Sequence, residues 1–443
     1  MIHGRAPDAI TPASLARERE ALKWLFSFSD MERGAGWSAD ADAAEEWKLG
    51  RTRALLDLAA APDRRMRCVL IAGTKGKGST AAFLAALLHA GGVRAGLYTQ
   101  PHLQSYRERI RVDGAMIEPQ AFASAVDRWR GTVDAFTARH PKAGRPTTFE
   151  ITTALALAHF AEAGCTVAVL EVGLGGRLDA TNAVEPELSV LSTIDRGHTD
   201  ILGTRLEEIA REKAGILRRG RAALIARQRP TVRRALLAAC REVGAACRWV
   251  DPVPTSTVLA LRGEHQRQNA ALAVAAATEL GIRAGADALR ELRWPGRIET
   301  PGGAWRVVLD GAHDPVSARA LADELRSRRI ERIQLVIGMY RDKDAARILR
   351  PLLPLAERVW ATSPKSPRAL PARDLARVCR RLGRVPIELH ANVAEAIEAA
   401  RHAAGDRSVV VTGSLALVGE ARDHLGLAPV ERLWDPRRLS IIR

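Results

Sequence analysis

The stretch "LIAGTKGKGST", residues 70–80, decides how the first half of this chain is interpreted. The residues from Cys68 to Ile71 have the apolar character of a buried strand, and "TAAFLAALLHA" (80–90) is typical of a helix. The glycines therefore fall in the turn that joins a strand to a helix. Glycine lets the backbone approach a ligand closely, and a helix N-terminus offers free N–H groups and a positive dipole end. The stretch predicts a loop that binds phosphate.

A lysine and two hydroxyls in this loop suit a nucleotide. Lys77 would reach the β and γ phosphates, and the hydroxyl of Ser79 or Thr80 would hold Mg²⁺. The strict pattern places Ser or Thr directly after the lysine, whereas Gly78 intervenes here. A glycine turn without a ligand is the alternative, and the flanking strand and helix favour the phosphate loop. The candidate nucleotide-binding residues of the loop are Gly73, Thr74, Gly76, Lys77, Gly78, Ser79 and Thr80.

Composition limits the possible partners. The chain has 443 residues, which predicts two domains, and a net charge of +16, which suits a nucleic acid, a membrane or small anionic substrates. The basic residues are spread along the chain and aromatic residues make up only 4%, so few stacking platforms for bases exist. The N-terminus has no signal-peptide core, and no apolar run is long enough to span a bilayer. We expect a soluble, cytoplasmic monomer with neither a nucleic-acid nor a membrane partner.

The five cysteines show no paired spacing typical of a zinc site. They are Cys68, Cys165, Cys240, Cys247 and Cys379, and they lie far apart or within apolar stretches. We therefore expect them to be reduced.

Two series of strand-like runs alternate with helical ones. The first runs from 67–73 through 95–99, 166–173, 188–195 and 221–226, and the second comprises 305–311, 332–338, 358–363 and 408–414. Such alternation predicts α/β domains with mostly parallel sheets and helices on both faces. Between the two series, "RWPGRIETPGG" (293–303) has the proline and glycine content of a hinge. We place an ATP-binding domain at 1–296 and a smaller α/β domain at 297–443.

Polar residues at the ends of two strands indicate a metal–phosphate site. Glu171 ends the strand in "TVAVLEVG" (166–173), and His198 follows the strand that ends on Asp195. Open α/β sheets bind ligands at the carboxyl ends of their strands, the edge that also carries the glycine loop. Alternatively, Glu171 is a capping or ion-pair residue and His198 a surface histidine. Because both residues would lie at the same carboxyl edge of the sheet, we favour the metal site.

Three further stretches offer weaker signals. Lys213 lies in an apolar helix, where a lysine that extends to solvent is the plain alternative. Asp310 ends a strand of the second series, and His313 follows before a helix, so this segment is either a helix cap or a functional element facing the first domain. Asn269, with Gln266, opens a long helix and suits the edge of an adenine.

Taken together, the chain resembles the folylpolyglutamate synthase and dihydrofolate synthase group of the Mur ligase superfamily. The resemblance covers most of the chain and rests on these stretches in the family's order: "GTKGKGST", "RERIRVDG", "TTFEITTALALAHF", "EVGLGGRLDATN", "STIDRGHTDILG", "IAREKAGI", "HQRQNAALA", "WPGRIE", "LDGAHDP" and "VTGSLALVGE". It implies a P-loop ATPase-like first domain with a Rossmann-like second domain. It also implies an enzyme that uses ATP and Mg²⁺ to activate a pteroate or folate carboxylate, to which L-glutamate is then joined.

The resemblance implies a role for each matched residue. Lys77 would grip the transferred phosphoryl group, Ser79 and Glu171 would hold one Mg²⁺, and His198 would hold a second. Lys213 matches the family's carbamylated lysine. Groups that reach ATP are matched by Asn269, Arg297 and Asp310, the histidine of the "LDGAHDP" motif is His313, and the loop near the pteroate contains Pro101, His102 and Arg109.

Three residues depart from the family's pattern. Lys75 and Asp314 each stand where the family usually has asparagine, and Gln100 stands where serine is more usual. Lys75 would add positive charge beside the triphosphate, and the replacement by Gln100 leaves the details of acceptor binding open. Two other functions are alternatives: a Mur-superfamily ligase for a different acid and amine, and an ATP-binding module or motor acting on nucleic acid. The sequence leaves open whether one or both folate reactions occur.

Overall fold

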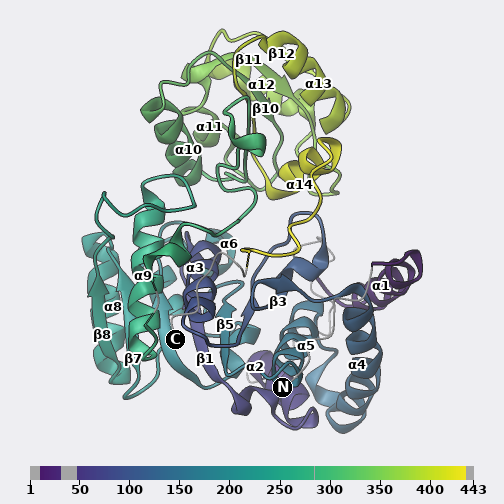
Figure 1. The fold of residues 1–443 in the computed structure, drawn as a ribbon, viewed down its shortest axis with the longest axis vertical. Helices are drawn as coiled ribbons and strands as arrows, with labels where there is room; N and C mark the ends of the chain where they lie inside the picture. The colour runs from purple at the N-terminus through teal and green to yellow at the C-terminus, as the bar shows by residue number, and fades with distance from the viewer. Residues whose placement is uncertain (1–9, 31–46, 284, 436–443) are drawn as a thin grey trace.

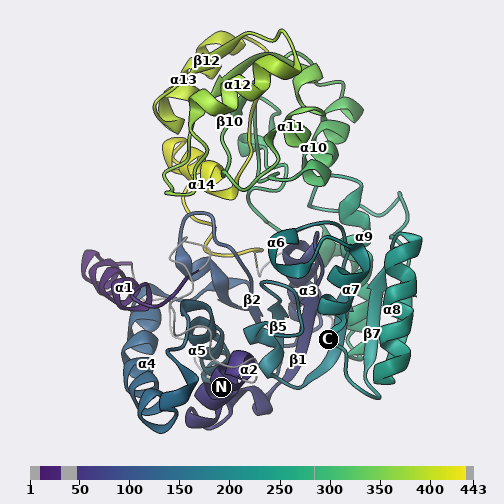
Figure 2. The same ribbon diagram turned by 180° about the vertical axis from the view of Figure 1, so that it is seen from behind.

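The computed structural model describes residues 10–30, 47–283 and 285–435, which form two α/β units with one sheet each. The first sheet has eight strands in the order β4-β3-β2-β5-β1-β6-β7-β8, and the second has five in the order β12-β11-β10-β13-β9. Figures 1 and 2 show the second unit set against one end of the first. The predicted two-domain α/β class is confirmed.

The first sheet is parallel except at one edge. There β3 runs antiparallel to both β2 and β4, whereas every other neighbouring pair is parallel. The strands are β1 (Arg67–Ala72), β2 (Ala95–Tyr98), β3 (Ile110–Val112), β4 (Ala115–Met116), β5 (Val167–Glu171), β6 (Pro186–Leu191), β7 (Ala222–Ala226) and β8 (Ala246–Val250). Because β1 lies between β5 and β6, the loop after β1 lies in the middle of the sheet's carboxyl edge.

Helices cover both faces of this sheet, as the run of apolar residues in β1 requires. Val69 and Ile71 face one core with α3 (Lys77–Ala90) and α9 (His265–Glu279). Cys68 and Leu70 face the other core. The helices there are α1 (Pro12–Leu25), α2 (Trp47–Leu58), α4 (Pro119–Arg139), α5 (Thr148–Glu162), α7 (Leu206–Ala214) and α8 (Pro230–Val243).

The second sheet is entirely parallel and also has two cores. Its strands are β9 (Val307–Asp310), β10 (Ile333–Ile337), β11 (Ala356–Ala361), β12 (Ile387–Leu389) and β13 (Val409–Thr412). One face carries α10 (Pro315–Ser327), α11 (Ala345–Leu349) and α12 (Ala372–Leu382), and the other carries α13 (Val393–Ala404) and α14 (Leu415–His424).

The chain crosses between the two units twice. After α14 it returns to the first unit, as the yellow segment in Figure 1 shows. There the N–H of Leu433 donates to Gly114 O at 3.0 Å, and Leu433 O accepts from the N–H of Arg293 at 2.6 Å. Trp434 is 2% exposed in the core beside α3. The domain boundary near Gly296 stays a prediction. Because of the returning tail, two covalent connections that lie close together join the second unit to the first.

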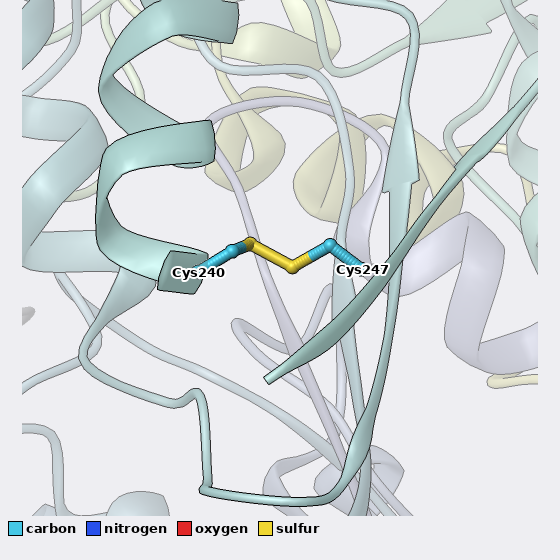
Figure 3. The surroundings of a disulfide bond; sticks show 2 residues. All are labelled: Cys240 and Cys247. Atoms are coloured by element: carbon cyan, nitrogen blue, oxygen red, sulfur yellow. A yellow bond between two sulfur atoms is a disulfide. The ribbon is translucent and has the colours of Figure 1, made fainter. Parts of the chain in front are cut away.

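Two of the five cysteines form a disulfide, contrary to the expectation that all are reduced. Cys240 near the end of α8 is bonded to Cys247 in β8 (Figure 3). The remaining three, Cys68, Cys165 and Cys379, are free and buried. The pair could not be recognised from its spacing, because seven positions separate its members and no CxxC pattern marks them. Among the described helices, none is long and apolar enough to cross a bilayer.

Candidate active site

The predicted phosphate loop lies between β1 and α3, as the sequence indicated. Gly76 is the residue before α3 and has a φ of 85°, in the left-handed region that glycine adopts without strain. A Cβ atom on Gly76 would also collide with the side-chain amide of Asn269. Lys77 begins α3, so the unpaired N–H groups of the first helical turn surround the loop. This arrangement offers the free N–H groups and the positive dipole end that the predicted anion site requires.

Oxygen donors and the loop lysine come together beside β5. The Nζ of Lys77 lies 3.9 Å from the Glu171 carboxylate, and a Cβ on Gly78 would lie 3.1 Å from the same carboxylate. Ser79 and Thr80 are buried at the start of α3. The buried Thr80 Oγ1 has no hydrogen-bond partner in the part of the chain that the structure describes. The start of α3 and the end of β5 thus bring together the Lys77 ammonium, two hydroxyls and the Glu171 carboxylate.

These donors fit a hard divalent cation. Mg²⁺ takes oxygen ligands and usually retains several waters, and it combines one or two carboxylates with substrate phosphates. Glu171 supplies a carboxylate, and Ser79 and Thr80 supply hydroxyls. Within residues 10–30, 47–283 and 285–435, no cluster of three or more His, Cys, Asp and Glu side chains could hold a metal. A cation here would therefore depend on hydroxyls and phosphate as well as on Glu171.

The loop after β6 lies against the phosphate loop. Thr74 Oγ1 donates to Asp195 O at 2.8 Å and accepts from the N–H of Asp195 at 3.1 Å. A Cβ on Gly197 would lie 3.0 Å from the Thr74 methyl group. His198 follows, exposed, at the start of the short helix α6 (Thr199–Leu202), with a φ of 51°. The structure thus brings the histidine's loop to the predicted site.

Lys213 is buried in α7, next to the glycine-rich loop after β5. A Cβ on Gly176 would lie 2.9 Å from Lys213 O, so only glycine permits this packing. Burial, followed by the charge of Lys77, lowers the pKa of Lys213 to about 7. The buried carboxylate of Asp179 partly opposes this shift; Asp179 itself accepts from the N–H groups of Leu174 and Thr181 at 2.9 and 3.0 Å. Lys213 is therefore a lysine whose neutral amine is accessible near pH 7.

The second unit presents Asp310, at the end of β9, and His313 to this region. Asp310 accepts from the N–H groups of Ile298 and Ala312 at 2.8 and 2.9 Å, and burial raises its pKa to about 6 although Arg297 opposes the shift. His313 Nδ1 lies 2.7 Å from Gly311 O, which only accepts, so Nδ1 carries the proton and Nε2 can accept. Burial, followed by the charge of Lys75, lowers the pKa of His313 to about 4.

The two residues that stand where the family usually has asparagine interact between the two units. Lys75 of the phosphate loop forms an ion pair with Asp314, the residue that caps the N-terminus of α10. They are 239 positions apart in the chain. In the sequence each is an isolated departure, and their pairing was missed because only the three-dimensional arrangement relates the two loops.

Asn269 lies against the phosphate loop at the start of α9. Its Oδ1 is the atom that a Cβ on Gly76 would strike, and its Nδ2 donates to Gln266 Oε1 at 2.9 Å. The structure thus places the amide at the predicted nucleotide site.

The predicted acceptor loop follows β2 and has a defined conformation. The Gln100–Pro101 peptide bond is cis, and the N–H of Gln100 donates to the Glu171 carboxylate at 3.1 Å. The Arg109 Nε donates to His102 Nδ1 at 3.1 Å, and its guanidinium lies 4.5 Å from the centre of the Tyr106 ring. Burial, followed by the charge of Arg109, lowers the pKa of His102 to about 3. The loop is thus hydrogen-bonded to Glu171 through Gln100, and it carries a neutral histidine, His102, beside an arginine, Arg109, that stacks on Tyr106.

Glu108 and Arg422 were missed at the sequence level although they hold this loop. The Glu108 carboxylate accepts from the N–H groups of Leu103, Gln104 and Ser105 at 2.8–2.9 Å. Arg422, 3% exposed in α14, donates to Gln104 Oε1 at 2.7 Å. The stretch "SYRERI" carries a usable signal for Glu108, since Ser105 and Glu108 have the spacing of a capping box. No local pattern marks Arg422.

Family comparisons agree with this geometry. The Mur ligase middle domain matches residues 71–243, and the glutamate ligase domain of Mur ligases matches residues 296–415. The fold and the loop therefore define a ligase of the Mur type.

Individual relatives specify the family. The dihydrofolate synthase/folylpolyglutamate synthase of Bacillus subtilis is 32% identical, over 85% of this chain and 94% of its own. The protein of that name from Mycobacterium tuberculosis is 34% identical, over 86% of this chain and 90% of its own. A Halobacterium salinarum protein, named a probable bifunctional folylpolyglutamate synthase/dihydropteroate synthase, is 36% identical over 80% of this chain, which spans about half, 46%, of that relative. The chain belongs to the folylpolyglutamate synthase/dihydrofolate synthase family.

Solved structures of the family superpose on the whole fold. Mycobacterium tuberculosis folylpolyglutamate synthase, complexed with ADP and AMPPCP, has a TM-score of 0.84 at 32% identity and covers 94% of this chain and all of its own. Escherichia coli FolC in complex with DHPP and ADP has a TM-score of 0.79 at 28% identity, over 95% of this chain and 99% of its own. The Yersinia pestis enzyme, complexed with AMPPNP and Mn ion, has a TM-score of 0.79 at 28% identity, over 96% of this chain and 100% of its own.

Proposed function

We propose that this protein uses ATP to join L-glutamate to dihydropteroate, to the γ-carboxylate of a folate polyglutamate, or to both. The observation that best supports this proposal is the contact between the phosphate loop and the segment between β9 and α10, formed by Lys75 and Asp314. This contact places the predicted nucleotide-binding loop against a second unit that has polar groups of its own. An acyl phosphate hydrolyses readily, so a ligase of this kind needs two units that close around the reaction and exclude water.

In the first step, an oxygen of the acceptor carboxylate forms a bond to the γ-phosphorus of ATP. The bond from that phosphorus to the bridging oxygen breaks, and ADP leaves with the electron pair. Lys77 and the N–H groups at the start of α3 neutralise the charge of the transferring phosphoryl group. Asn269, Arg297 and Asp310 would contact the nucleotide, the last two from the second unit.

In the second step, the neutral amine of glutamate forms a bond to the acyl carbon. Phosphate leaves with the electron pair of the breaking carbon–oxygen bond, and the nitrogen loses a proton to give the amide. His313 is neutral at physiological pH because its pKa is about 4, so its Nε2 can accept a hydrogen bond from the nucleotide or from glutamate. Pro101, His102 and Arg109 would border the pteroate.

Divalent cations would be held beside the phosphate loop. Ser79 and Glu171 would hold one Mg²⁺, with Thr80 as a further hydroxyl, and His198 would hold a second together with a carbamate on Lys213. Bound Mg²⁺ offsets negative charge on the phosphate oxygens. Lys213 suits carbamylation because its buried amine, with a pKa of about 7, can add to carbon dioxide and release a proton.

A phosphate-release assay over a panel of acceptors and amino acids tests the function. The acceptors are dihydropteroate, tetrahydrofolate and its triglutamate, each offered with L-glutamate, D-glutamate or L-aspartate, and mass spectrometry identifies the amide product. We expect release only with L-glutamate and a pteroate or folate. Turnover confined to another acid and amino acid would assign the chain to a different Mur-type reaction.

A further inference from the structure

Lys75 and Asp314 are each fixed on a rigid part of their own unit. The N–H of Lys75 donates to Thr193 O at 3.0 Å, which ties the phosphate loop to the segment after β6. Asp314 Oδ1 accepts from the N–H groups of Val316 and Ser317 at 3.0 and 3.2 Å, and Oδ2 accepts from Ser317 Oγ at 2.7 Å. Both backbones are therefore held, so the ion pair between the side chains fixes one unit relative to the other.

The pair is partly removed from water and lies among other cations. The side chains of Lys75 and Asp314 are 26% and 17% exposed. Burial lowers the pKa of Lys75, while Asp314 opposes that shift and Lys77 and Lys343 add to it. Burial acts to raise the pKa of Asp314, but Lys75 and His313 together hold it well below its usual range. Each charge thus depends on the other, and loss of one partner leaves the other charge uncompensated.

The ammonium of Lys75 also has a second potential partner. Lys75 is two residues from Lys77 in the loop that would hold the triphosphate, so nucleotide phosphate and Asp314 can compete for it. A carboxylate that occupies Lys75 weakens phosphate binding, while the same contact favours the closed arrangement of the two units. One ion pair would therefore lower nucleotide affinity while it stabilises the closed arrangement of the two units.

We propose that Lys75 and Asp314 are positioning residues that hold the second unit on the phosphate loop, and that Asp314, by occupying the Lys75 ammonium, lowers the loop's affinity for nucleotide. This inference rests on the proposed function for its kinetic consequence, but the contact, nucleotide binding and domain separation can each be measured without turnover. It also gives a single physical explanation for the two residues that replace the family's usual asparagines, since the charges that they introduce are opposite and form a pair.

Two single variants and their combination separate the effects. Asp314→Asn keeps the helix cap, because asparagine caps as well as aspartate, but frees Lys75 for phosphate. We expect it to bind a fluorescent ADP analogue about three- to tenfold more tightly and to lower kcat severalfold, the range that the net contribution of one ordinary hydrogen bond implies. Lys75→Asn leaves the Asp314 carboxylate beside the phosphates, so we expect binding at least about tenfold weaker. Lys75→Asn/Asp314→Asn should bind within about threefold of wild type.

Domain separation is measured by small-angle X-ray scattering without nucleotide. Both single variants should have a larger radius of gyration than wild type, whereas Asp406→Asn, in an exposed ion pair with Arg306 at 2.9 Å within the second unit, should match wild type in every assay. Binding of the ADP analogue by Asp314→Asn that is no tighter than by wild type, or wild-type scattering in both single variants, would overturn the proposal. If ligation fails but binding and scattering change as described, the proposed function is wrong and the positioning role stands.

Discussion

Arg422 and Gln104 lie 318 positions apart in the chain, yet the Arg422 Nε donates to Gln104 Oε1 at 2.7 Å. The Gln104 Nε2 also donates to Asp423 Oδ1 at 2.7 Å and to Leu427 O at 2.8 Å. Arg422 in turn forms an ion pair with Glu299, which lies within the predicted hinge segment 293–303. A residue of the predicted acceptor loop is thus bonded to the helix that precedes the returning tail, so the loop and the second unit should move together.

Gln104→Ala should raise the KM for the pteroate or folate acceptor. The variant removes hydrogen bonds worth about 0.5–1.5 kcal/mol each, which corresponds to a rise of about three- to tenfold for a loss equivalent to one bond. Binding of ADP should remain unchanged because the phosphate loop is not altered. Arg401→Ala, at an exposed position of α13, is the control. An unchanged acceptor KM would show that the Gln104 contacts do not order the loop.

Lys77→Ala should reduce turnover by at least about 10²-fold without loss of folded structure. The ammonium offsets charge that develops during phosphoryl transfer, and preorganised groups of this kind contribute such factors. Steady-state phosphate release and circular dichroism give the two measurements, with Lys142→Ala, at an exposed position before α5, as the control. Activity within a few-fold of wild type would remove Lys77 from its assigned role.

The sequence predicted the parts of the site that depend on local pattern. The loop at 70–80 lies between a buried strand and a helix, so glycine spacing and apolar runs were enough to place Gly76, Lys77 and Glu171. The strands β3, β4 and β12 were not predicted, because runs of two or three residues carry too little periodicity. The edge strand β8 was missed as well, since none of its five residues is buried and Arg248 interrupts its apolar run.

Long-range pairings carry no local signature. Lys75 with Asp314 and Arg422 with Gln104 join segments more than 200 positions apart, and their residues are ordinary charged or polar side chains in sequence. The return of residues 430–434 to the first unit was missed for the same reason: a short apolar pair such as Leu433 and Trp434 fits either core equally well.

Trp434→Ala should destabilise the protein by about 3–5 kcal/mol, the usual cost of truncating a buried tryptophan. The side chain is 2% exposed and packs on Gly114, where a Cβ atom would lie only 2.7 Å from the indole ring. Because this tail is the second connection between the units, the radius of gyration should also increase. Chemical denaturation and scattering measure the two effects. Val258→Ala, which alters a side chain 56% exposed, should change neither.

Lys213 should make activity depend on carbon dioxide and on pH. Burial lowers its pKa to about 7, so the neutral amine predominates above that pH and is protonated below it. Carbamate formation consumes the amine and releases a proton, so at a fixed partial pressure of carbon dioxide turnover should increase as pH rises through 7. Lys213→Ala should lose at least about 10²-fold in turnover and recover partly with a short carboxylic acid. Wild-type turnover in the alanine variant would leave Lys213 with a structural role only.

Two measurements besides activity bear on the same lysine. With ¹³C-labelled bicarbonate, the protein should show a carbamate carbon resonance that Lys213→Met lacks. Without carbon dioxide, the folded pKa of about 7 lies below the ordinary value of 10.5, so the unfolded state binds more protons between these values. The free energy of unfolding should therefore rise with pH across that window. Denaturant titrations at several pH values should show that the free energy of unfolding rises less steeply with pH for Lys213→Met. Equal slopes together with no carbamate signal would mean that the Lys213 ammonium remains solvated and charged.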